Sequence, residues 1–379
     1  MVEINFFSDK KCGGMYPLNL GRCESTLHYG GRAIQDQWKE ALDSAHSKRI
    51  ILNSRILPTV DAIEIITLLE PNQQWIHKGE LIAECEGVSE GYDAGINHSP
   101  TMLETPEDLF ERCGEGLAED LDRIQYSWRT RTLSEDERSA WTEAGVFVHG
   151  EMERIHLAPG AVVRNCTLNT EEGDIVVGPD AELMEGCRVR GPFLIGPMSQ
   201  LKMGTLVYGP TSIGAHSKVG GELSNVVIHD YSNKAHGGFL GNSVIGSWCN
   251  LGAETSSSNL KNNYSEISVF NQENKTQDKR GRTFCGLLMG DHSKTAIHTA
   301  FNTATVVGAF CNVFGSATPK KHIPSFTWGG GESSEIHNLE KAIETARRVM
   351  LRRGVELSKD QEKEIGELYK ASAIWHKEI

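Results

Sequence analysis

The stretch from Val177 to Gly220 reads VGPDAELMEGCRVRGPFLIGPMSQLKMGTLVYGPTSIGAHSKVG. An aliphatic residue stands at every sixth position, eight times without a break, at Val177, Leu183, Val189, Ile195, Leu201, Val207, Ile213 and Val219. A spacing of six does not keep one face of a helix with 3.6 residues per turn, and the stretch is rich in glycine and β-branched residues. The six-residue repeat is therefore the feature that decides the fold.

The repeat continues beyond this stretch. After its phase slips by two residues it resumes at Ile245 and Leu251, and it returns at Met289, Thr295, Phe301, Val307 and Val313. Glycine often follows the aliphatic residue, and a small side chain often stands four residues after it, as at Ala181, Ser199, Ser217 and Ser293. If three hexads form one triangular coil, aliphatic side chains fill the interior, glycine permits the turn backbone, and the small residue fits beside a corner. The pattern predicts a left-handed parallel β-helix, a hexapeptide-repeat solenoid, over residues 151–330.

The polar segment 256–286 interrupts the hexads. We interpret it as a loop ejected from the coil, because it lacks the aliphatic positions that a coil needs. One interpretation is a tolerated surface insertion, since long loops cost little additional closure entropy. The other is a wall beside a neighbouring active site, because long loops in compact domains often carry function. The sequence leaves both open.

The chain on either side of the solenoid has a different character. Residues 1–104 alternate strand-like segments (2–7 and 49–59) with helix-like segments (32–45 and 60–70), as in a small α/β domain. Residues 105–150 predict a helical linker that begins at Thr105 and Pro106. Residues 331–379 have helical periodicity interrupted near Gly354, and we expect two helices that cap the open end of the solenoid.

Composition narrows the classes of function. The chain has 379 residues and a net charge of −13, so it is long enough for more than one core and is poorly suited to bind nucleic acid or an anionic membrane. Its nine cysteines are odd in number and lack C-x-x-C spacing, which favours free thiols in a reducing compartment. Residues 1–11 lack the apolar run of a signal peptide. We expect a cytoplasmic protein.

The segment 233–263, NKAHGGFLGNSVIGSWCNLGAETSSSNLKNN, resembles the acetyltransferase half of a known family, the bifunctional N-acetylglucosamine-1-phosphate uridylyltransferase/glucosamine-1-phosphate acetyltransferases. Further motifs along the whole chain are similar to the shorter, alternative form of this enzyme in Bacteroidetes-type bacteria: YPLNLGR, LPT, DLF, SNLKNNYSEI, FCGLLMGDHS and IPSFTWGG. Residues 1–104 would then form a nucleotidyltransferase-like domain.

The resemblance implies roles for individual residues. His236 falls at the family's general base, Glu222 at the carboxylate that orients this base, and Asn259 at a catalytic asparagine. The substrate-binding residues that we infer are Lys234, Phe239, Asn250, Lys261, Arg190 and Lys202. The chemistry agrees with the choice of base, because acetyl transfer to an amine needs an unprotonated nitrogen, and histidine titrates near neutral pH. Asn259 could donate a hydrogen bond to the developing charge on the thioester oxygen.

The implied activity is acetyl transfer from acetyl-CoA to an amino-sugar 1-phosphate, glucosamine 1-phosphate, by a homotrimer. The N-terminal domain would transfer uridylyl from UTP with Mg²⁺, in UDP-N-acetylglucosamine synthesis for the cell envelope. Its nucleotide-binding candidates are Lys10, Gly13, Gly14 and Arg22, because the backbone N–H groups of a glycine-rich turn can approach phosphate closely.

Two other hypotheses stay open. Leu260 and Ser224 stand where the family usually has a tyrosine and a phosphate-binding lysine, so the chain could be a non-catalytic trimeric scaffold that binds sugar nucleotides. His292 and His298 occupy the fourth place of adjacent hexads, and a β-helix can bind zinc through histidines between subunits, as a γ-type carbonic anhydrase does. No metal is expected in the β-helix under the acetyltransferase hypothesis.

Overall fold

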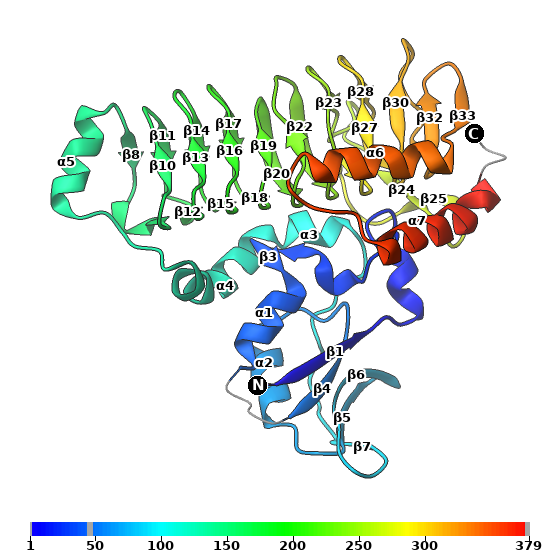
Figure 1. Ribbon diagram of the computed structural model, residues 1–379. Helices are drawn as coiled ribbons and strands as arrows, with labels where there is room; N and C mark the ends of the chain where they lie inside the picture. The colour runs from blue at the N-terminus through cyan, green and yellow to red at the C-terminus, as the bar shows by residue number, and fades with distance from the viewer. Residues whose placement is uncertain (1, 44–47, 376–379) are drawn as a thin grey trace.

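A computed structural model describes residues 2–43 and 48–375 of the chain. The end of the predicted helix 32–45 and residues 376–379 of the predicted C-terminal helices lie outside the described residues. A long stack of parallel coils dominates the molecule, and an α/β region formed by the first part of the chain lies against one side of it (Figure 1). Within the described residues, no helix combines the length and apolar character needed to cross a membrane.

Each regular coil has three short strands, and every strand pairs in parallel with the strand of the next coil. We name the three sides of the stack by their strands. Face 1 contains β9 (Ile155–Leu157), β12 (Ile175–Val177), β15 (Phe193–Ile195), β18 (Thr211–Ile213), the second halves of β20 (Glu222–Ile228) and β22 (Phe239–Ile245), β26 (Leu287–Met289), β29 (Thr305–Val307) and β31 (His322–Ile323).

Face 2 contains β10 (Val162–Val163), β13 (Glu182–Leu183), β16 (Gln200–Leu201), β19 (Lys218–Val219), β21 (Asn233–Lys234), β27 (Lys294–Thr295), β30 (Asn312–Phe314) and β32 (Thr327–Gly330). Face 3 contains β8 (Phe147–His149), β11 (Thr167–Asn169), β14 (Arg188–Arg190), β17 (Leu206–Tyr208), the first halves of β20 and β22, β23 (Ser256–Ser257) and β28 (Ala300–Phe301). The stack therefore begins at β8, inside the segment 105–150 that we expected to be a linker.

The aliphatic residues of the hexads fill the interior, and the prediction of a parallel β-helix with hexad coils is confirmed. Residues such as Val177, Leu201 and Ile213 are fully buried in one core that runs along the stack. Partners in register are 18 residues apart in regular coils, as for Val177 with Ile195 and Leu183 with Leu201. This spacing equals three hexads, which is the coil that the repeat predicts.

The glycines of the hexads have a different role from the predicted one. Gly196 follows Ile195 and does not have a positive φ, so its turn conformation is open to other residues. A Cβ on Gly196 would lie 2.8 Å from the backbone nitrogen of Ala215 in the next coil. The positive φ belongs to the fourth hexad residue instead, for example 56° at His216 and 61° at Trp248. Glycine is thus required by the close approach of successive coils.

The small residues at the corners link successive coils. The hydroxyl of Ser199 accepts a hydrogen bond from the Ser217 N–H at 2.8 Å and donates one to the Gly214 carbonyl at 2.7 Å. Ser293 connects Cys311 and Gly308 in the same way, at 3.0 and 2.6 Å. A larger side chain would not fit at these fully buried positions, so the predicted location beside a corner is confirmed.

The phase slip after Val219 results from shortened turns. Val207 pairs with Leu223, and Val219 pairs with Lys234, so the inward columns continue through residues that the hexad spacing does not identify. Only Gly220 and Gly221 connect β19 to β20, whereas residues 202–205 connect β16 to β17. The coil that begins near Val219 is consequently shorter than the regular 18 residues.

The polar segment 256–286 leaves the stack after β23 and returns at β26. Its outer part is an antiparallel hairpin of β24 (Ser268–Asn271) and β25 (Thr276–Lys279). Two arginines behind the hairpin pair with α3 (Glu107–Glu111): Arg280 lies 3.1 Å from Glu107, and Arg282 lies 2.9 Å from Asp108. The segment therefore packs against the N-terminal region, with Val269 and Phe270 in the same core, and these two ion pairs tie it to α3.

The N-terminal region has a mixed sheet with the order β1 (Glu3–Phe7), β4 (Arg49–Asn53), β6 (Glu80–Cys85), β5 (Gln73–His77) and β7 (Tyr92–Asp93). Its helices are α1 (Ile34–Ala41), α2 (Val60–Leu68), α3 and α4 (Cys113–Trp128), and β2 (His28–Tyr29) pairs with β3 (Arg32–Ala33). The outward side chains of face 1 share a core with this region, among them Leu194, Val244 and Leu288. Face 1 is consequently covered, while face 2, face 3 and the corner between them lie away from the N-terminal region.

The C-terminal helices do not cap the stack, which corrects our expectation. Both α6 (Leu339–Leu351) and α7 (Lys359–Ser372) lie along the side of the stack (Figure 1). Their apolar residues, including Ala346 and Leu368, pack on Phe310 and Phe326 at the corner between faces 1 and 2. The last strand edge of face 2 is instead paired by β33 (Ser334–Ile336), which runs antiparallel to β32. At the opposite end of the stack lies α5 (Glu135–Glu143).

We predict that Gly196→Ala lowers the free energy of unfolding by about 2 kcal/mol, because the new methyl group meets backbone atoms that cannot move without separating two coils. Denaturant unfolding followed by circular dichroism measures the effect. Gly366→Ala is the matched control, because a Cβ at Gly366 in α7 meets nothing within 4 Å and should stabilise the helix slightly. Equal effects of the two substitutions would contradict the coil-spacing explanation.

Candidate active site

His236 lies on the turn 235–238 at the corner between faces 2 and 3, and it is exposed. The turn backbone is held against the next coil, where the Glu254 N–H donates to the Gly237 carbonyl at 3.1 Å. Gly238 has a φ of 105°, and a Cβ there would lie 2.2 Å from the Thr255 carbonyl oxygen. The two glycines after His236 therefore allow a tight turn that presents the imidazole to the surface.

Glu222 and Phe239 meet the same corner from face 3. They are partners in register on β20 and β22, and the Glu222 N–H donates to the Gly238 carbonyl at 3.2 Å. In the described part of the chain, no hydrogen bond or ion pair joins the Glu222 carboxylate to the His236 imidazole. The structure thus brings together the predicted base, its predicted carboxylate and the predicted aromatic contact, but it does not form the predicted orienting contact.

Lys234 is inside the coil, which corrects its prediction as a substrate-binding residue. It occupies an inward hexad position, where its partner in register is Val219, and it is 2% exposed. Its ammonium donates to the carbonyls of Gly220 at 3.0 Å, His236 at 2.9 Å and Gly237 at 3.0 Å. Burial lowers the pKa of Lys234 to about 8. The ammonium therefore holds the His236 turn from behind and is not available to a ligand on the surface.

Asn259 lies at the opposite end of face 3 from His236. Its Nδ2 donates to Oδ1 of Asn242 at 2.8 Å, and a Cβ on Gly241 would meet both Asn259 Nδ2 and Phe239 Cζ at 2.6 Å. Asn242 is three positions after Phe239 in β22, or about 10 Å away at the usual rise. Within one chain, Asn259 consequently borders Phe239 without reaching the turn that carries His236.

The remaining predicted contacts are spread over faces 2 and 3 and the ejected segment. Asn250 is exposed on face 2, where its backbone bridges Asn233 and Lys294. Lys202 lies beside the short turn at Gly220 and Gly221. Its Cβ is 3.3 Å from the place that a Cβ on Gly220 would occupy. Arg190 lines a hollow of about 340 Å³ on face 3. Lys261 belongs to the ejected segment and donates to the Glu266 carbonyl at 2.5 Å, so it is engaged locally.

The nucleotide-binding candidates of the N-terminal region do not form one phosphate site. A Cβ on Gly14 would lie 2.6 Å from the Glu104 carbonyl oxygen, and one on Gly13 would lie 2.7 Å from a carboxylate oxygen of Glu273. These oxygens repel an anion. Lys10 is exposed, and Arg22 is directed to the solenoid, where its Nη1 lies 3.2 Å from Asp291. The phosphate-binding turn stays a prediction, and the surroundings of its glycines do not favour it.

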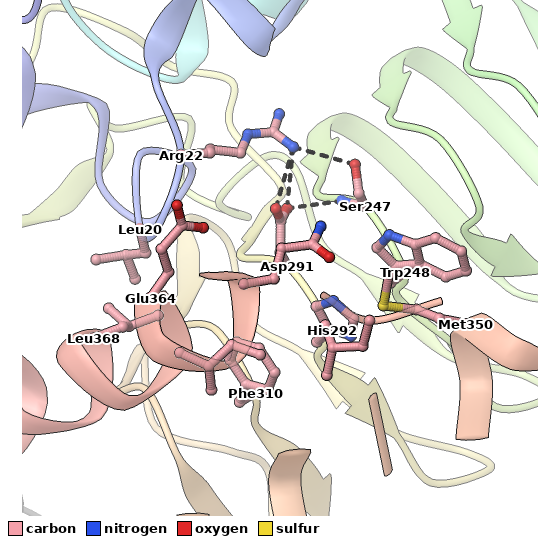
Figure 2. Close-up of a pocket in the computed structure, with 14 residues that line it drawn as sticks. Leu20, Arg22, Ser247, Trp248, Asp291, His292, Phe310, Met350, Glu364 and Leu368 are labelled. Carbon is pink, nitrogen blue, oxygen red and sulfur yellow. Dashed lines mark hydrogen bonds and ion pairs between the residues drawn. The ribbon is translucent and has the colours of Figure 1, made fainter. Parts of the chain in front are cut away.

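Arg22 lines a cavity that the sequence did not identify (Figure 2). The cavity has a volume of about 220 Å³ and lies between the N-terminal segment, the corner of faces 1 and 2, and α7. Arg22 Nη1 also donates to the Ser247 hydroxyl at 3.1 Å, and the Ser247 N–H donates to Asp291 at 2.8 Å. Burial raises the pKa of Asp291, while the Arg22 guanidinium opposes that shift. The cavity wall is thus held by a partly buried ion pair.

His292 belongs to an aromatic ladder that borders this cavity. Its ring stacks on Phe310 with the ring centres 4.8 Å apart, and on Trp248 with the centres 6.0 Å apart. Burial lowers the pKa of His292 to about 3. Aromatic residues at the fourth position of successive hexads could have predicted this ladder from the sequence. Its members are His216, Tyr231, Trp248, His292, Phe310 and Phe326.

The zinc hypothesis does not fit this arrangement. His292 is at the corner of faces 1 and 2, whereas His298 is at the corner that carries His236, with its N–H donating to the Ala253 carbonyl at 2.8 Å. Over residues 2–43 and 48–375, no three histidine, cysteine, aspartate or glutamate side chains gather in a way that could hold a metal ion. The two histidines therefore do not converge within one chain.

Comparison with known proteins gives partial likenesses. No family model matches the chain. It is 28% identical over 107 residues to "Bifunctional protein GlmU" of Methanocaldococcus jannaschii, which is 28% of this chain and 26% of that protein. The chain thus matches about a quarter of the length of this curated relative.

Two solved structures illustrate the structural likenesses. A UDP-N-acetylglucosamine acyltransferase from Campylobacter jejuni has a TM-score of 0.39 and 14% identity, over 60% of this chain and 81% of that one. AntD, an N-acyltransferase from Bacillus cereus in complex with dTDP and 3-hydroxybutyryl-CoA, has a TM-score of 0.23 and 14% identity, over 59% of this chain and 98% of that one.

The buried lysine predicts a pH dependence of stability. Since the folded pKa of about 8 is below the ordinary 10.5, the unfolded state binds more protons between these pH values, and the contribution of Lys234 to stability rises with pH in this window. We compare the unfolding free energies of the wild type and of Lys234→Met, which lacks the titrating group. The difference between them should change in favour of the wild type by about 1–3 kcal/mol between pH 8 and 10.5. Chemical denaturation at several pH values measures it. A constant difference would mean that the buried group does not titrate there.

A second prediction concerns the ion pair at the cavity. Arg22→Ala should lower the unfolding free energy by about 3 kcal/mol, because it leaves the buried Asp291 carboxylate without its cation. Adding Asp291→Asn should recover part of this loss in denaturant unfolding. Arg348→Ala removes an exposed arginine that pairs with Glu344 and should cost less than about 1 kcal/mol. If Arg22→Ala is as mild as this control, the ion pair does not stabilise the junction.

Proposed function

We propose that the protein is an acyl-CoA-dependent acyltransferase that acts on a sugar phosphate, with His236 as the general base. The observation that carries the proposal is the exposed His236 turn, beside Glu222 and Phe239, at the corner opposite the covered face 1. The resemblance of residues 233–263 to the acetyltransferase half of the bifunctional family supports acetyl as the acyl group and glucosamine 1-phosphate as the acceptor, in UDP-N-acetylglucosamine synthesis. The partial likeness to "Bifunctional protein GlmU" agrees with this resemblance.

The proposed reaction balances with one acid–base residue. The acceptor amine attacks the thioester carbonyl, and His236 takes the proton that the nitrogen loses. The C–N bond forms, the C–S bond of the tetrahedral intermediate breaks, and the protonated His236 returns the proton to the departing CoA thiolate. Glu222, beside the His236 turn, would accept a hydrogen bond from the second ring nitrogen and so orient the imidazole. In this proposal Glu222 is a positioning residue.

The proposal includes a homotrimer because the candidate residues occupy opposite ends of an open face. His236 and Glu222 are at one end of face 3, and Asn259 and Lys261 are near the other. Side-by-side packing of copies would bring the two ends together, so that Asn259 could stabilise the oxyanion at a neighbour's His236. Light scattering that gives the mass of a monomer would contradict this arrangement.

Uridylyl transfer is left out of the proposal. UTP and Mg²⁺ would need a phosphate cradle in the N-terminal region, and Gly13 and Gly14 face a carboxylate and a carbonyl oxygen instead. The absence of a Glu222–His236 contact in the described chain favours a second candidate, a sugar-nucleotide-binding scaffold without catalysis. An activity assay separates the two candidates.

We predict that purified protein releases the CoA thiol from acetyl-CoA when glucosamine 1-phosphate is added, and that His236→Ala lowers the rate about 100-fold or more, since general-base catalysis contributes roughly that factor. A thiol-reactive dye measures the release. His298→Ala is the matched control, because His298 is also exposed at this corner and has no role in the proposed reaction. Full activity of His236→Ala would remove this residue from the mechanism. Binding of sugar nucleotide without turnover by the wild type would favour the scaffold.

A further inference from the structure

Four cationic side chains gather on face 2 although the chain has a net charge of −13. We call Lys202, Lys218, Arg352 and Arg353 the face 2 basic cluster. Burial lowers the pKa of Lys218, and the charged groups that act on it, Arg353, Lys202 and Arg352, are all cations and lower it further. The positive charges of these side chains repel one another, and a bound anion would remove this repulsion.

The positions of these residues follow from the fold. Lys218 on β19 is the partner in register of Asn233 on β21. Arg353, in the connection between α6 and α7, donates from Nη2 to Oδ1 of Asn233 at 3.1 Å. Lys202 follows β16 and borders the short turn at Gly220. The C-terminal connection therefore brings its two arginines to the lysines of face 2.

Many other arginines of the protein have carboxylate partners. Arg32 pairs with Asp120 at 2.7 Å, Arg280 pairs with Glu107 at 3.1 Å, and Arg348 pairs with Glu344. Among the described residues, no carboxylate lies within ion-pair distance of the face 2 basic cluster. Guanidinium groups bind phosphate in a bidentate geometry, and ammonium groups bind it as point charges. A phosphorylated ligand matches the cluster in charge and in hydrogen-bonding chemistry.

The number of phosphates distinguishes between the two phosphorylated substrates of the proposed reaction. Glucosamine 1-phosphate carries one phosphate, directly beside the reacting amine, so it would occupy only part of a cluster of four cations. CoA carries its diphosphate and its 3′-phosphate at the far end of a long pantetheine arm. Its nucleotide end can reach the cluster while its thioester is at the His236 corner.

Resting on the proposed acyltransferase function, we propose that the face 2 basic cluster binds the phosphate groups of the CoA donor. Lys218 and Arg352 are the residues to test, because neither side chain makes a hydrogen bond or an ion pair in the described structure and their loss leaves the coil intact. They hold the donor away from the reacting atoms, so their loss should raise the KM for acetyl-CoA and leave kcat unchanged.

Isothermal titration of the full-length protein with CoA tests the proposal. We expect Lys218→Gln and Arg352→Gln each to weaken CoA binding about tenfold, the usual loss for a charge-assisted hydrogen bond. Arg348→Gln, on α6 and paired with Glu344, is the matched control and should change it less than twofold. Pantetheine, which lacks the nucleotide end, should bind the wild type and all variants alike.

The contradicting outcomes separate this inference from the function on which it rests. Unchanged CoA affinity in Lys218→Gln and Arg352→Gln, with an active wild type, overturns the cluster as a donor site and leaves the acyltransferase in place. Weaker binding of glucosamine 1-phosphate, with CoA binding unchanged, means that the cluster holds the acceptor phosphate and also overturns the inference. A wild type that binds no CoA refutes both proposals.

Discussion

The backbone hydrogen bonds between successive coils are the constraint on which the rest of the structure depends. They hold each strand directly beneath its partner, so a residue at one hexad position always meets the same position of the next coil. The consequence is a set of columns along the stack. Aliphatic residues such as Ile195 and Ile213 fill the interior, glycines stand where a Cβ would meet the next backbone, and serines link neighbouring turns.

Apart from the ejected segment 256–286, three departures from regular stacking fall close together in the chain. Gly220 and Gly221 shorten one turn, Lys234 replaces an aliphatic residue, and His229 stands where the neighbouring coils have glycine. Each departure needs compensation: Lys234 is held by three carbonyls, and the His229 Nε2 accepts a hydrogen bond from the His28 N–H at 3.1 Å. Natural proteins tend to break local rules at functional sites. The same short stretch carries the exposed His236.

The other parts of the chain determine which surfaces remain open. The N-terminal region buries the outward side of face 1, and α6 and α7 cover the adjacent corner. Charged residues at these contacts are paired, as Arg280 is with Glu107 and Arg22 is with Asp291, because an unpaired buried charge is costly. Face 2, face 3 and the His236 corner remain uncovered by the N-terminal region. The candidate active site and the face 2 basic cluster both lie on this exposed side.

The sequence by itself determined the solenoid and its buried aliphatic columns, because a hexad pattern is local and every coil repeats the same contacts. Tertiary structure alone decided that Lys234 points inward, that the C-terminal helices lie along a corner, and that Gly13 and Gly14 face a carboxylate and a carbonyl oxygen. It also joined Arg22 to Asp291, 269 residues away in the chain. Such contacts depend on how distant segments pack, and neither periodicity nor motif spacing records which segments meet.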